Sequence, residues 1–246
     1  MHVIITGAAS GIGRGSALRL GRRMKVVVAD RDLAGARCVA GEIEAAGGQA
    51  LGVEVDVSSR ASVKDMVASA RKAFGPVDAL FANAGINRRN PVDQIPESDW
   101  DLMMNTHVKG VFLCCQSVLG EMVERGKGAI VNTSSDFAIM GVAGNATYTS
   151  AKTAIYSLTK AIATEFTPKG IRVNAIGPGP IDTPLLASGR SADQHMAAKQ
   201  KFAATLPLGR MGRPEDVAMT VDFLLSDRAS YISGQLVHPN GGQLMW

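Results

Sequence analysis

The sequence is poor in cysteine, in aromatic residues and in long apolar runs. Its three cysteines (Cys38, Cys114 and Cys115) are too few for a disulfide framework, so we expect reduced thiols and a cytoplasmic protein. No stretch approaches the roughly 18 apolar residues of a membrane span, and residues 1–6 have no signal-peptide pattern. The four histidines are scattered, and no cluster has the spacing of a zinc site. A membrane partner and a catalytic metal are therefore not expected.

The sequence also lacks a strong excess of charge of one sign. Its 26 basic and 22 acidic residues give a net charge of +4, and no aromatic residues interleave with the basic cluster of residues 14–25. Nucleic-acid binding is therefore not expected. There is no Gly-x-Ser-x-Gly motif, which argues against a serine hydrolase. With 46% hydrophobic residues the chain is not disordered.

Short apolar runs alternate with longer helical patterns along the whole chain. This alternation predicts one α/β domain over residues 1–246, a doubly wound parallel sheet of about seven strands with helices on both faces. The expected strands are His2–Thr6, Lys25–Ala29, Ala50–Val55, Ala79–Ala82, Ala129–Thr133, Arg172–Ile176 and Gln235–His238. The expected helices are Gly11–Gly21, Leu33–Ala46, Arg60–Phe74, Glu97–Arg125, Thr147–Thr167 and Pro214–Leu225. An irregular stretch, residues 182–207 with a weak helix at 192–203, is typical of a lid, which we call the lid segment.

A glycine-rich loop follows the first expected strand. Gly7, Gly11 and Gly13 allow a tight turn into a helix whose N-terminus can face a pyrophosphate. The second strand ends at Asp30, whose carboxylate can accept the ribose hydroxyls of NAD and would repel a 2′-phosphate. Arg31 is evidence for NADP instead, because its guanidinium can neutralise that phosphate. We expect NAD as the cofactor.

A second set of polar residues lies at the end of the fifth expected strand and on the helix that follows it. Tyr148 and Lys152 are four residues apart, so on a helix they share one face. A nearby ammonium favours the phenolate, which would bring the pKa of Tyr148 closer to neutrality and suit it to proton transfer. The strand before this helix ends in a Thr-Ser-Ser run at residues 133–135, and Asn105 lies inside a long helical pattern.

Together these features resemble the short-chain dehydrogenase/reductase family over essentially the whole chain. The matching positions follow the family's order: Thr6-Gly7-x3-Gly11-x-Gly13, Asp56-Val57, Asn83-Ala84-Gly85, Asn105, Ser135, Tyr148-x3-Lys152 and Pro178-Gly179-x-Ile181-x-Thr183. The resemblance implies a Rossmann-type fold and a catalytic set of Asn105, Ser135, Tyr148 and Lys152. In it Tyr148 is the general acid/base and Lys152 lowers its pKa.

The resemblance also implies which residues bind cofactor and substrate. The residues expected to bind NAD are Gly7, Ser10, Gly11, Ile12, Gly13, Asp30, Arg31, Asp56, Val57, Asn83, Ala84, Gly85, Tyr148, Lys152, Pro178, Gly179, Ile181 and Thr183. The residues expected to bind substrate are Ser135, Phe137, Asn145 and Tyr148. Asp136 is expected to cap the next turn, or else to contact a polar substrate. Members of this size are usually homotetramers, and we expect the C-terminal Trp246 to pack across a subunit interface or over the edge of its own sheet.

The implied function is an NAD(H)-dependent oxidoreductase that interconverts a secondary alcohol and a ketone. An alternative is an NADPH-dependent 3-oxoacyl-thioester (acyl carrier protein) reductase, which shares the whole motif set and differs first in cofactor preference. A dinucleotide-binding regulator without catalysis would not need Tyr148 and Lys152. A methyltransferase with a similar sheet leaves those two residues and the loop at 178–183 unexplained.

Overall fold

The computed structural model describes residues 1–187 and 191–245, and its centre is a seven-stranded parallel sheet. The strands are β1 (His2–Thr6), β2 (Lys25–Asp30), β3 (Ala50–Glu54), β4 (Ala79–Ala82), β5 (Gly128–Thr133), β6 (Ile171–Ile176) and β7 (Leu236–Val237). Their order across the sheet is β3-β2-β1-β4-β5-β6-β7. The expected doubly wound sheet is confirmed, and every expected strand is present with its ends shifted by at most one residue.

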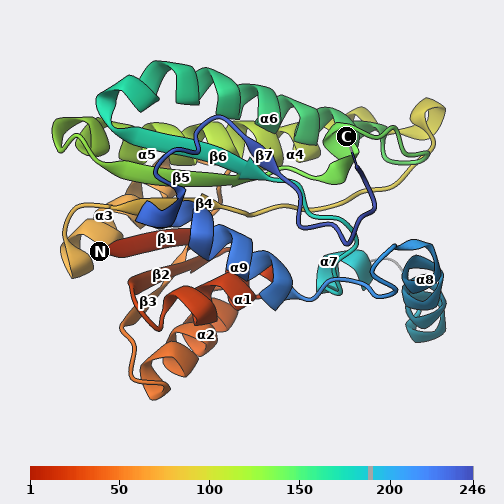
Figure 1. Ribbon diagram of the computed structural model, residues 1–246, viewed down its shortest axis with the longest axis horizontal. Coiled ribbons are helices and arrows are strands. Elements are labelled where there is room, and N and C mark those ends of the chain that lie inside the picture. The colour runs from red at the N-terminus through yellow and green to blue at the C-terminus, as the bar shows by residue number, and fades with distance from the viewer. Residues whose placement is uncertain (188–190, 246) are drawn as a thin grey trace.

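Helices cover both faces of the sheet, because the side chains of each strand point alternately to one face and the other. Figure 1 shows α4, α5 and α6 above the sheet and α1, α2 and α9 below it. The helices are α1 (Gly11–Leu20), α2 (Leu33–Ala45), α3 (Arg60–Phe74), α4 (Glu97–Met104), α5 (Gly110–Glu124), α6 (Ala146–Phe166), α7 (Pro184–Ala187), α8 (Ala192–Thr205) and α9 (Pro214–Leu225). Short 3-10 turns occupy Val92–Gln94, Asp136–Ala138, Thr167–Lys169 and Asp227–Ala229.

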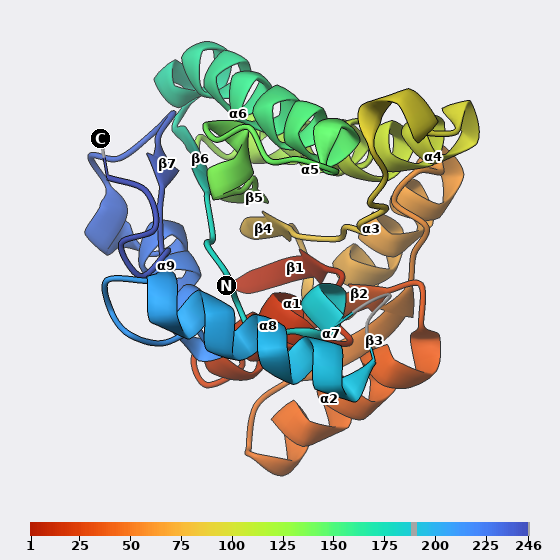
Figure 2. The same cartoon turned by 90° about the vertical axis from the view of Figure 1, so that its right-hand side faces the viewer.

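The order of the strands reverses between β1 and β4, and this reversal positions the site. Chain connections leave β1 for one side and β4 for the other, which opens a crevice at the carboxyl ends of the strands. In Figure 2 the helices α7 and α8 lie in front of that edge. The lid segment therefore starts where the sheet presents its carboxyl ends.

Two expected elements differ from the structure. The single helix expected over Glu97–Arg125 is interrupted by a π-helical turn, Asn105–Lys109, which separates α4 from α5. Within the lid segment, α8 is two residues longer than expected and α7 was not anticipated; residues 188–190 of that segment lie outside the described part of the chain. Trp246 also lies outside the described residues, so its expected packing has no structural counterpart here.

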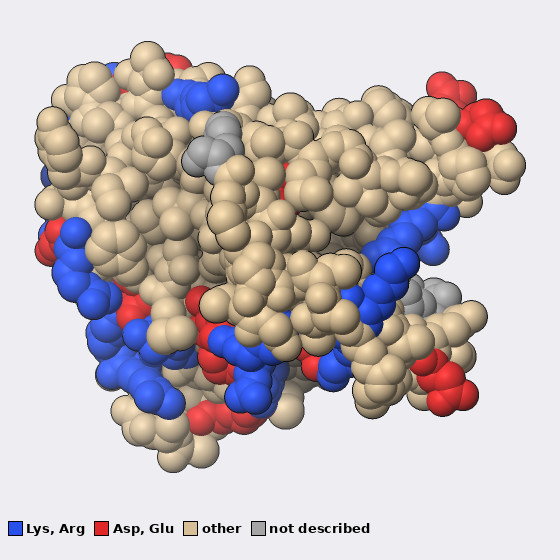
Figure 3. All heavy atoms as spheres, turned by 45° about the vertical axis from the view of Figure 1, so that its right-hand side comes forward, with Lys and Arg blue, Asp and Glu red and all other residues tan. Residues whose placement is uncertain are grey.

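In residues 1–187 and 191–245 no helix is long and apolar enough to cross a membrane. The same residues contain no group of three or more side chains that would hold a metal ion. Cys38 is exposed, whereas Cys114 and Cys115 are buried in α5, and all three are free thiols. On the face shown in Figure 3, basic and acidic side chains are mixed over the lower half of the molecule.

Helix α1, which follows the glycine loop, is held against α9 by one carboxylate. Asp222 of α9 is 6% exposed and accepts hydrogen bonds from Arg19 Nε at 3.0 Å and from Arg23 Nε at 2.6 Å. The buried carboxylate thus neutralises Arg19 of α1 and Arg23 of the turn after α1, and removing its charge leaves both arginines without their shared partner.

We predict that Asp222→Asn lowers the free energy of unfolding by about 2 kcal/mol, less than for a fully buried pair because both arginines are partly exposed. Urea unfolding followed by circular dichroism measures the change. Asp65→Asn, an exposed position on α3, serves as the control and should stay near the parent value. Equal stability of the two variants would contradict the role of this contact.

Candidate functional site

The loop between β1 and α1 brings backbone N–H groups to the carboxyl edge of the sheet. Gly7 has a φ of +64°, and a Cβ there would lie 2.7 Å from the Cα of Ala84, so only glycine fits. A Cβ on the buried Gly13 would collide with the carbonyl oxygen of Gly7. Ser10 is the N-cap residue of α1, and its side chain makes no capping hydrogen bond. The N-terminal amides of α1 therefore face a cavity that Ser10 lines, a setting that favours an anionic group.

Carboxylates at the ends of β2 and β3 lie along the same cavity. Asp30 Oδ2 accepts the backbone N–H of Ala9 at 2.9 Å, which ties the end of β2 to the glycine loop. Hydrogen bonds from the hydroxyl and backbone of Ser58 lower the pKa of Asp56, and the nearby charge of Arg31 lowers it further. Since Arg31 is exposed and also lines the cavity, this end offers both acceptor oxygens and a guanidinium.

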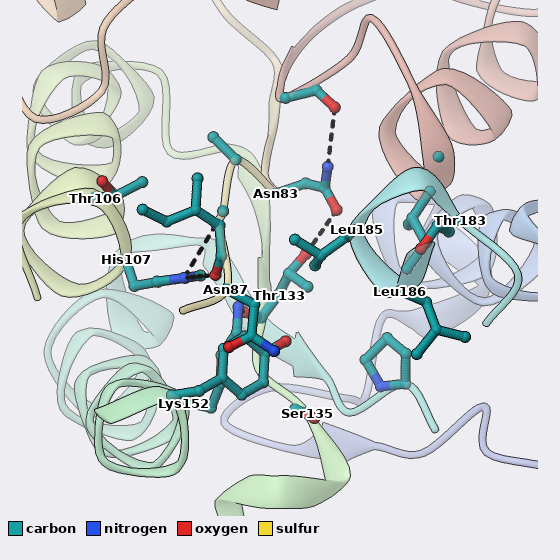
Figure 4. Close-up of a pocket in the computed structure, with 18 of the residues that line it drawn as sticks. Asn83, Asn87, Thr106, His107, Thr133, Ser135, Lys152, Thr183, Leu185 and Leu186 are labelled. Atoms are coloured by element: carbon teal, nitrogen blue, oxygen red, sulfur yellow. Dashed lines mark hydrogen bonds between the residues drawn. The ribbon is translucent and has the colours of Figure 1, made fainter. Parts of the chain in front are cut away.

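Asn83 joins the ends of three strands (Figure 4). Its Nδ2 donates to the carbonyl oxygens of Thr6 and Gly7, each at 3.2 Å. Its Oδ1 accepts the hydroxyl of Thr133 at 3.2 Å. The amide lines the cavity as expected, and it also fixes the relative positions of β1, β4 and β5.

Tyr148 and Lys152 lie one turn apart on α6 and face the cavity together with Ser135. Ser135 lies close enough to the phenol to lower its pKa. Lys152 is 2% exposed, its Nζ donates to the carbonyl oxygen of Thr133 at 2.8 Å, and it lies 5.3 Å from the centre of the Tyr148 ring. The Ser134 hydroxyl instead donates to the backbone oxygen of Lys152 at 2.7 Å, so the serine that meets the phenol is Ser135.

Burial changes the acid-base properties of both groups. It raises the pKa of Tyr148 to about 12, although the hydrogen bond with Ser135 and the charge of Arg89 act in the opposite direction. Burial lowers the pKa of Lys152 to about 7. The sequence-based expectation of a phenol made more acidic by the ammonium is therefore wrong. Burial disfavours the charged form of each group, so the phenolate and the ammonium are both destabilised.

Asn105, expected in the catalytic set, is exposed and does not line the cavity. The π-helical turn that begins at Asn105 changes the rotation of the chain, and π-turns often occur at functional sites. His107, two residues later, is 1% exposed and lines the cavity instead. Its Nε2 lies 2.7 Å from the carbonyl oxygen of Ile86, and its ring meets Tyr148 edge-on with the ring centres 5.5 Å apart.

Burial, and to a lesser extent the charge of Lys152, lower the pKa of His107 to about 3, so the imidazole is neutral at ordinary pH. A Cβ on Gly85 would lie 2.5 Å from Cε1 of His107. Glycine at this position therefore makes room for the ring, besides lining the cavity. The sequence contains this histidine but does not indicate that it faces the cavity. The π-turn places His107, and not Asn105, in the cavity wall.

Two polar residues near Tyr148 are structural. Asn145, expected to bind substrate, is buried outside the cavity lining, and its Oδ1 accepts Asn87 Nδ2 at 3.3 Å. Asp136 is fully buried, and its Oδ1 lies 2.5 Å from His238 Nδ1. The backbone N–H of Asp136 donates to Pro178 at 3.3 Å. Asp136 therefore braces the loops after β5, β6 and β7 against one another and does not line the cavity.

The cavity has a volume of about 560 Å³ and contains most of the predicted site. Gly13, Asn105 and Asn145 are the expected residues that do not line it. The lining residues that sequence reasoning did not assign to the site include Ile86, Asn87, Arg88, Arg89, Leu102, Thr106, His107, Thr133, Ser134, Pro180, Pro184, Leu186, Phe202 and Gln243. Residues 86–89 come directly after the Asn-Ala-Gly motif, and this position in the sequence could have indicated that they line the cavity. Others come from the lid segment and the C-terminal tail, whose position depends on the tertiary fold.

The described parts of the lid segment line the cavity, and contacts hold the segment in place at its start. A Cβ on Gly11 would lie 3.3 Å from the Cγ2 of Thr183, so the chain after β6 passes directly over the glycine loop. Asp182 forms an ion pair with Lys199 of α8 and lies 3.3 Å from Nε2 of His195. Through these contacts α8 brings the ring of Phe202 to the cavity wall.

Comparison with known proteins points to one family. A family model described as enoyl-(acyl carrier protein) reductase matches residues 7–243. The chain is 38% identical over 244 residues to (2S)-[(R)-hydroxy(phenyl)methyl]succinyl-CoA dehydrogenase subunit BbsD of Thauera aromatica, covering 99% of this chain and 96% of that protein. It is 38% identical over 246 residues to a 3-oxoacyl-[acyl-carrier-protein] reductase of Staphylococcus epidermidis, with 98% of both chains covered.

A solved structure agrees with these relatives. A short-chain dehydrogenase/reductase from Mycobacterium marinum superposes with a TM-score of 0.92 at 32% identity, covering 100% of this chain and 96% of that one. The fold, the cavity at the carboxyl edge and the matches over nearly the full length lead to one conclusion. The chain belongs to the short-chain dehydrogenase/reductase family, whose members are oxidoreductases that bind a nicotinamide dinucleotide.

Proposed function

We propose that this protein is an NAD(H)-dependent oxidoreductase that interconverts a secondary alcohol and a ketone, with Tyr148 as general acid/base. The observation that carries this proposal is the convergence of Tyr148, Ser135 and Lys152 in one cavity that continues to the glycine loop and Asp30. The residues along the cavity fit a dinucleotide. Uncapped amides at the start of α1 suit a pyrophosphate, and Asp30 offers acceptor oxygens to a ribose.

Tyr148 moves the proton in this proposal. When bound, the nicotinamide supplies or accepts the hydride at the reacting carbon. Tyr148 gives its phenolic proton to the substrate oxygen during reduction and takes it back during oxidation. Ser135 holds the same oxygen and donates a hydrogen bond as charge develops on it. Lys152 brings a positive charge near the phenol when protonated, and its bond to Thr133 fixes its position.

His107 takes the supporting place that the resemblance gave to Asn105. The ring is fixed by Ile86 on one side and lies edge-on to Tyr148 on the other, so it holds the phenol in place without carrying charge. Phe137 meets the Tyr148 ring edge-on at 5.9 Å between ring centres. Two rings thus restrict the phenol to an orientation that faces Ser135.

The cofactor preference rests on the end of β2. Asp30 would repel a 2′-phosphate, which supports NAD. Arg31 is exposed beside it and favours the alternative, an NADPH-dependent 3-oxoacyl-thioester reductase, the activity named for the Staphylococcus relative. Because Asp30 Oδ2 already accepts the N–H of Ala9, its carboxylate is fixed facing the glycine loop, and we rank NAD first.

The proposal includes a cytoplasmic homotetramer. The expected contact surface lies on the helices over residues 97–125 and 147–167. Trp100 of α4 and Phe112 of α5 are large apolar side chains that are 39% and 38% exposed, which supports a partner on this face.

We predict that Tyr148→Phe lowers kcat by about 10³-fold or more, since the variant loses its transferable proton, while NADH binding measured by fluorescence persists. The assay is a panel of alcohols and ketones followed at 340 nm with both cofactor couples. Tyr156→Phe on the same helix is the matched control and should keep full activity. Substantial turnover by Tyr148→Phe would remove Tyr148 from its role.

We predict that Asp30→Ala reduces the ratio of kcat/KM for NADH to that for NADPH, because the repulsion of a 2′-phosphate is lost. Arg31→Ala distinguishes the alternative. If the protein is an NADPH enzyme, this variant raises the KM for NADPH sharply. Equal use of both cofactors by the unmodified protein would refute the NAD assignment.

We predict a pH-dependent stability difference from the buried Lys152. With a folded pKa of about 7, Lys152 is deprotonated at pH 8.5 in the folded protein but protonated in the unfolded chain. The unfolded state then binds more protons, so stability rises with pH. The unfolding free energy of the unmodified protein minus that of Lys152→Met should therefore increase from about pH 7 towards pH 10.

Urea titrations of the cofactor-free protein at several pH values measure this difference. Lys160→Met on the exposed face of α6 is the control and should show no such slope. A difference that is flat or falls with pH would mean that Lys152 keeps its proton in the folded protein.

A further inference from the structure

The charged side chains of the cavity lie at or after the ends of three strands. In the described lining, Asp30 ends β2 and Asp56 follows β3, and Arg31 accompanies them, so positive and negative charge are mixed near the glycine loop. Arg88 and Arg89 follow β4 and line the cavity near Tyr148. Figure 3 shows basic side chains in the hollow on the right of the molecule. Within the described lining, Arg88 and Arg89 thus add positive charge to the cavity that holds the proposed acid/base.

The segment that carries these arginines is anchored on both sides of Tyr148. Ile86 is fixed by the buried ring of His107, and Asn87 donates to Asn145 at the start of α6 at 3.3 Å. His107 also contacts the ring of Tyr148, and Asn145 is the N-cap residue of the helix that carries Tyr148. Arg89 lines the same cavity as Tyr148, and its positive charge acts to lower the pKa of the phenol. Arg88 and Arg89 therefore line the cavity that holds Tyr148, on backbone that is held in place.

The remaining wall at this end is largely apolar. Leu102 comes from α4, Phe137 from the loop after β5, and Leu185, Leu186 and Phe202 from the lid segment. A molecule that fits here has an apolar body beside Tyr148. Arg88 and Arg89 are both exposed, and their planar guanidinium groups are well suited to a bidentate oxyanion.

We propose that Arg88 and Arg89 bind an anionic group of the substrate, a carboxylate or a phosphate, that is separate from the reacting carbon. This inference rests on the proposed function and names its substrate class: hydroxy or oxo compounds with an apolar body and an anionic end. A carboxylate on the body itself and the phosphates of a coenzyme A thioester share this chemistry. They differ in how far the anion lies from the reacting carbon, so the experiment separates them.

The test compares ketones that differ only in charge. One pair is 4-oxocyclohexanecarboxylate and its methyl ester, and the other is acetoacetyl-CoA and the neutral S-acetoacetyl-N-acetylcysteamine. For at least one pair, the unmodified protein should reduce the anionic member with the higher kcat/KM. The double variant Arg88→Gln/Arg89→Gln should lower that value by about 10- to 100-fold, as expected for lost charged hydrogen bonds, and change the neutral member by less than about threefold.

Two controls test whether the double variant affects substrate binding and not the protein or the cofactor in general. Arg37→Gln, an exposed position on α2, should change neither pair, and the KM for NADH should stay the same in the double variant. Equal losses for the charged and neutral members, or a change confined to the KM for NADH, would overturn the anion site. So would the absence of any preference for the charged members in the unmodified protein.

A binding measurement separates this inference from the proposed function. Calorimetric titration of the protein with coenzyme A, and separately with cyclohexanecarboxylate, needs no turnover. Binding that disappears in the double variant, in a protein that reduces no ketone, would support the arginine site and overturn the proposed reaction. Normal ketone reduction with no anion preference and no anion binding would support the proposed reaction and overturn the arginine site.

Discussion

The alignment of all strand ends at one edge of a parallel sheet is the constraint on which the site depends. Because every strand runs in the same direction, residues far apart in the sequence meet at this edge. Asn83 makes the arrangement rigid, since one amide bonds the ends of β1 and β5 from its place after β4. The buried pair of Asp136 and His238 does the same for the loops after β5 and β7. The cavity is shaped by these polar braces as much as by its lining.

Burial in this cavity opposes the chemistry that the residues are suited to perform. It favours the neutral forms of both Tyr148 and Lys152. The phenol needs compensation from nearby positive charge and from hydrogen bonds to the phenolate. Ser135 and Arg89 already act in that direction. A cationic nicotinamide would add to it, which is consistent with a group that becomes reactive in the complex.

The fold could be predicted almost completely from the sequence because apolar runs and helical patterns alternate without interruption. The site was less predictable where local geometry departs from regular structure. A π-turn changes which residue of the sequence Asn105-Thr106-His107 faces inwards, and helical periodicity does not reveal such a turn. Asn145 and Asp136 are buried by contacts with Asn87 and His238, which are 58 and 102 residues away in sequence. Contacts of this kind follow from the tertiary fold and have no local signal.

The central claim, that this cavity transfers a hydride to a carbonyl carbon while Tyr148 supplies the proton, has one direct measurement. Reduction of an accepted ketone with NADH deuterated at the transferring C4 position, followed by deuterium NMR of the alcohol, locates the transferred atom. The account predicts deuterium on the carbinol carbon and a solvent-derived proton on its oxygen. An alcohol without deuterium at that carbon would contradict it.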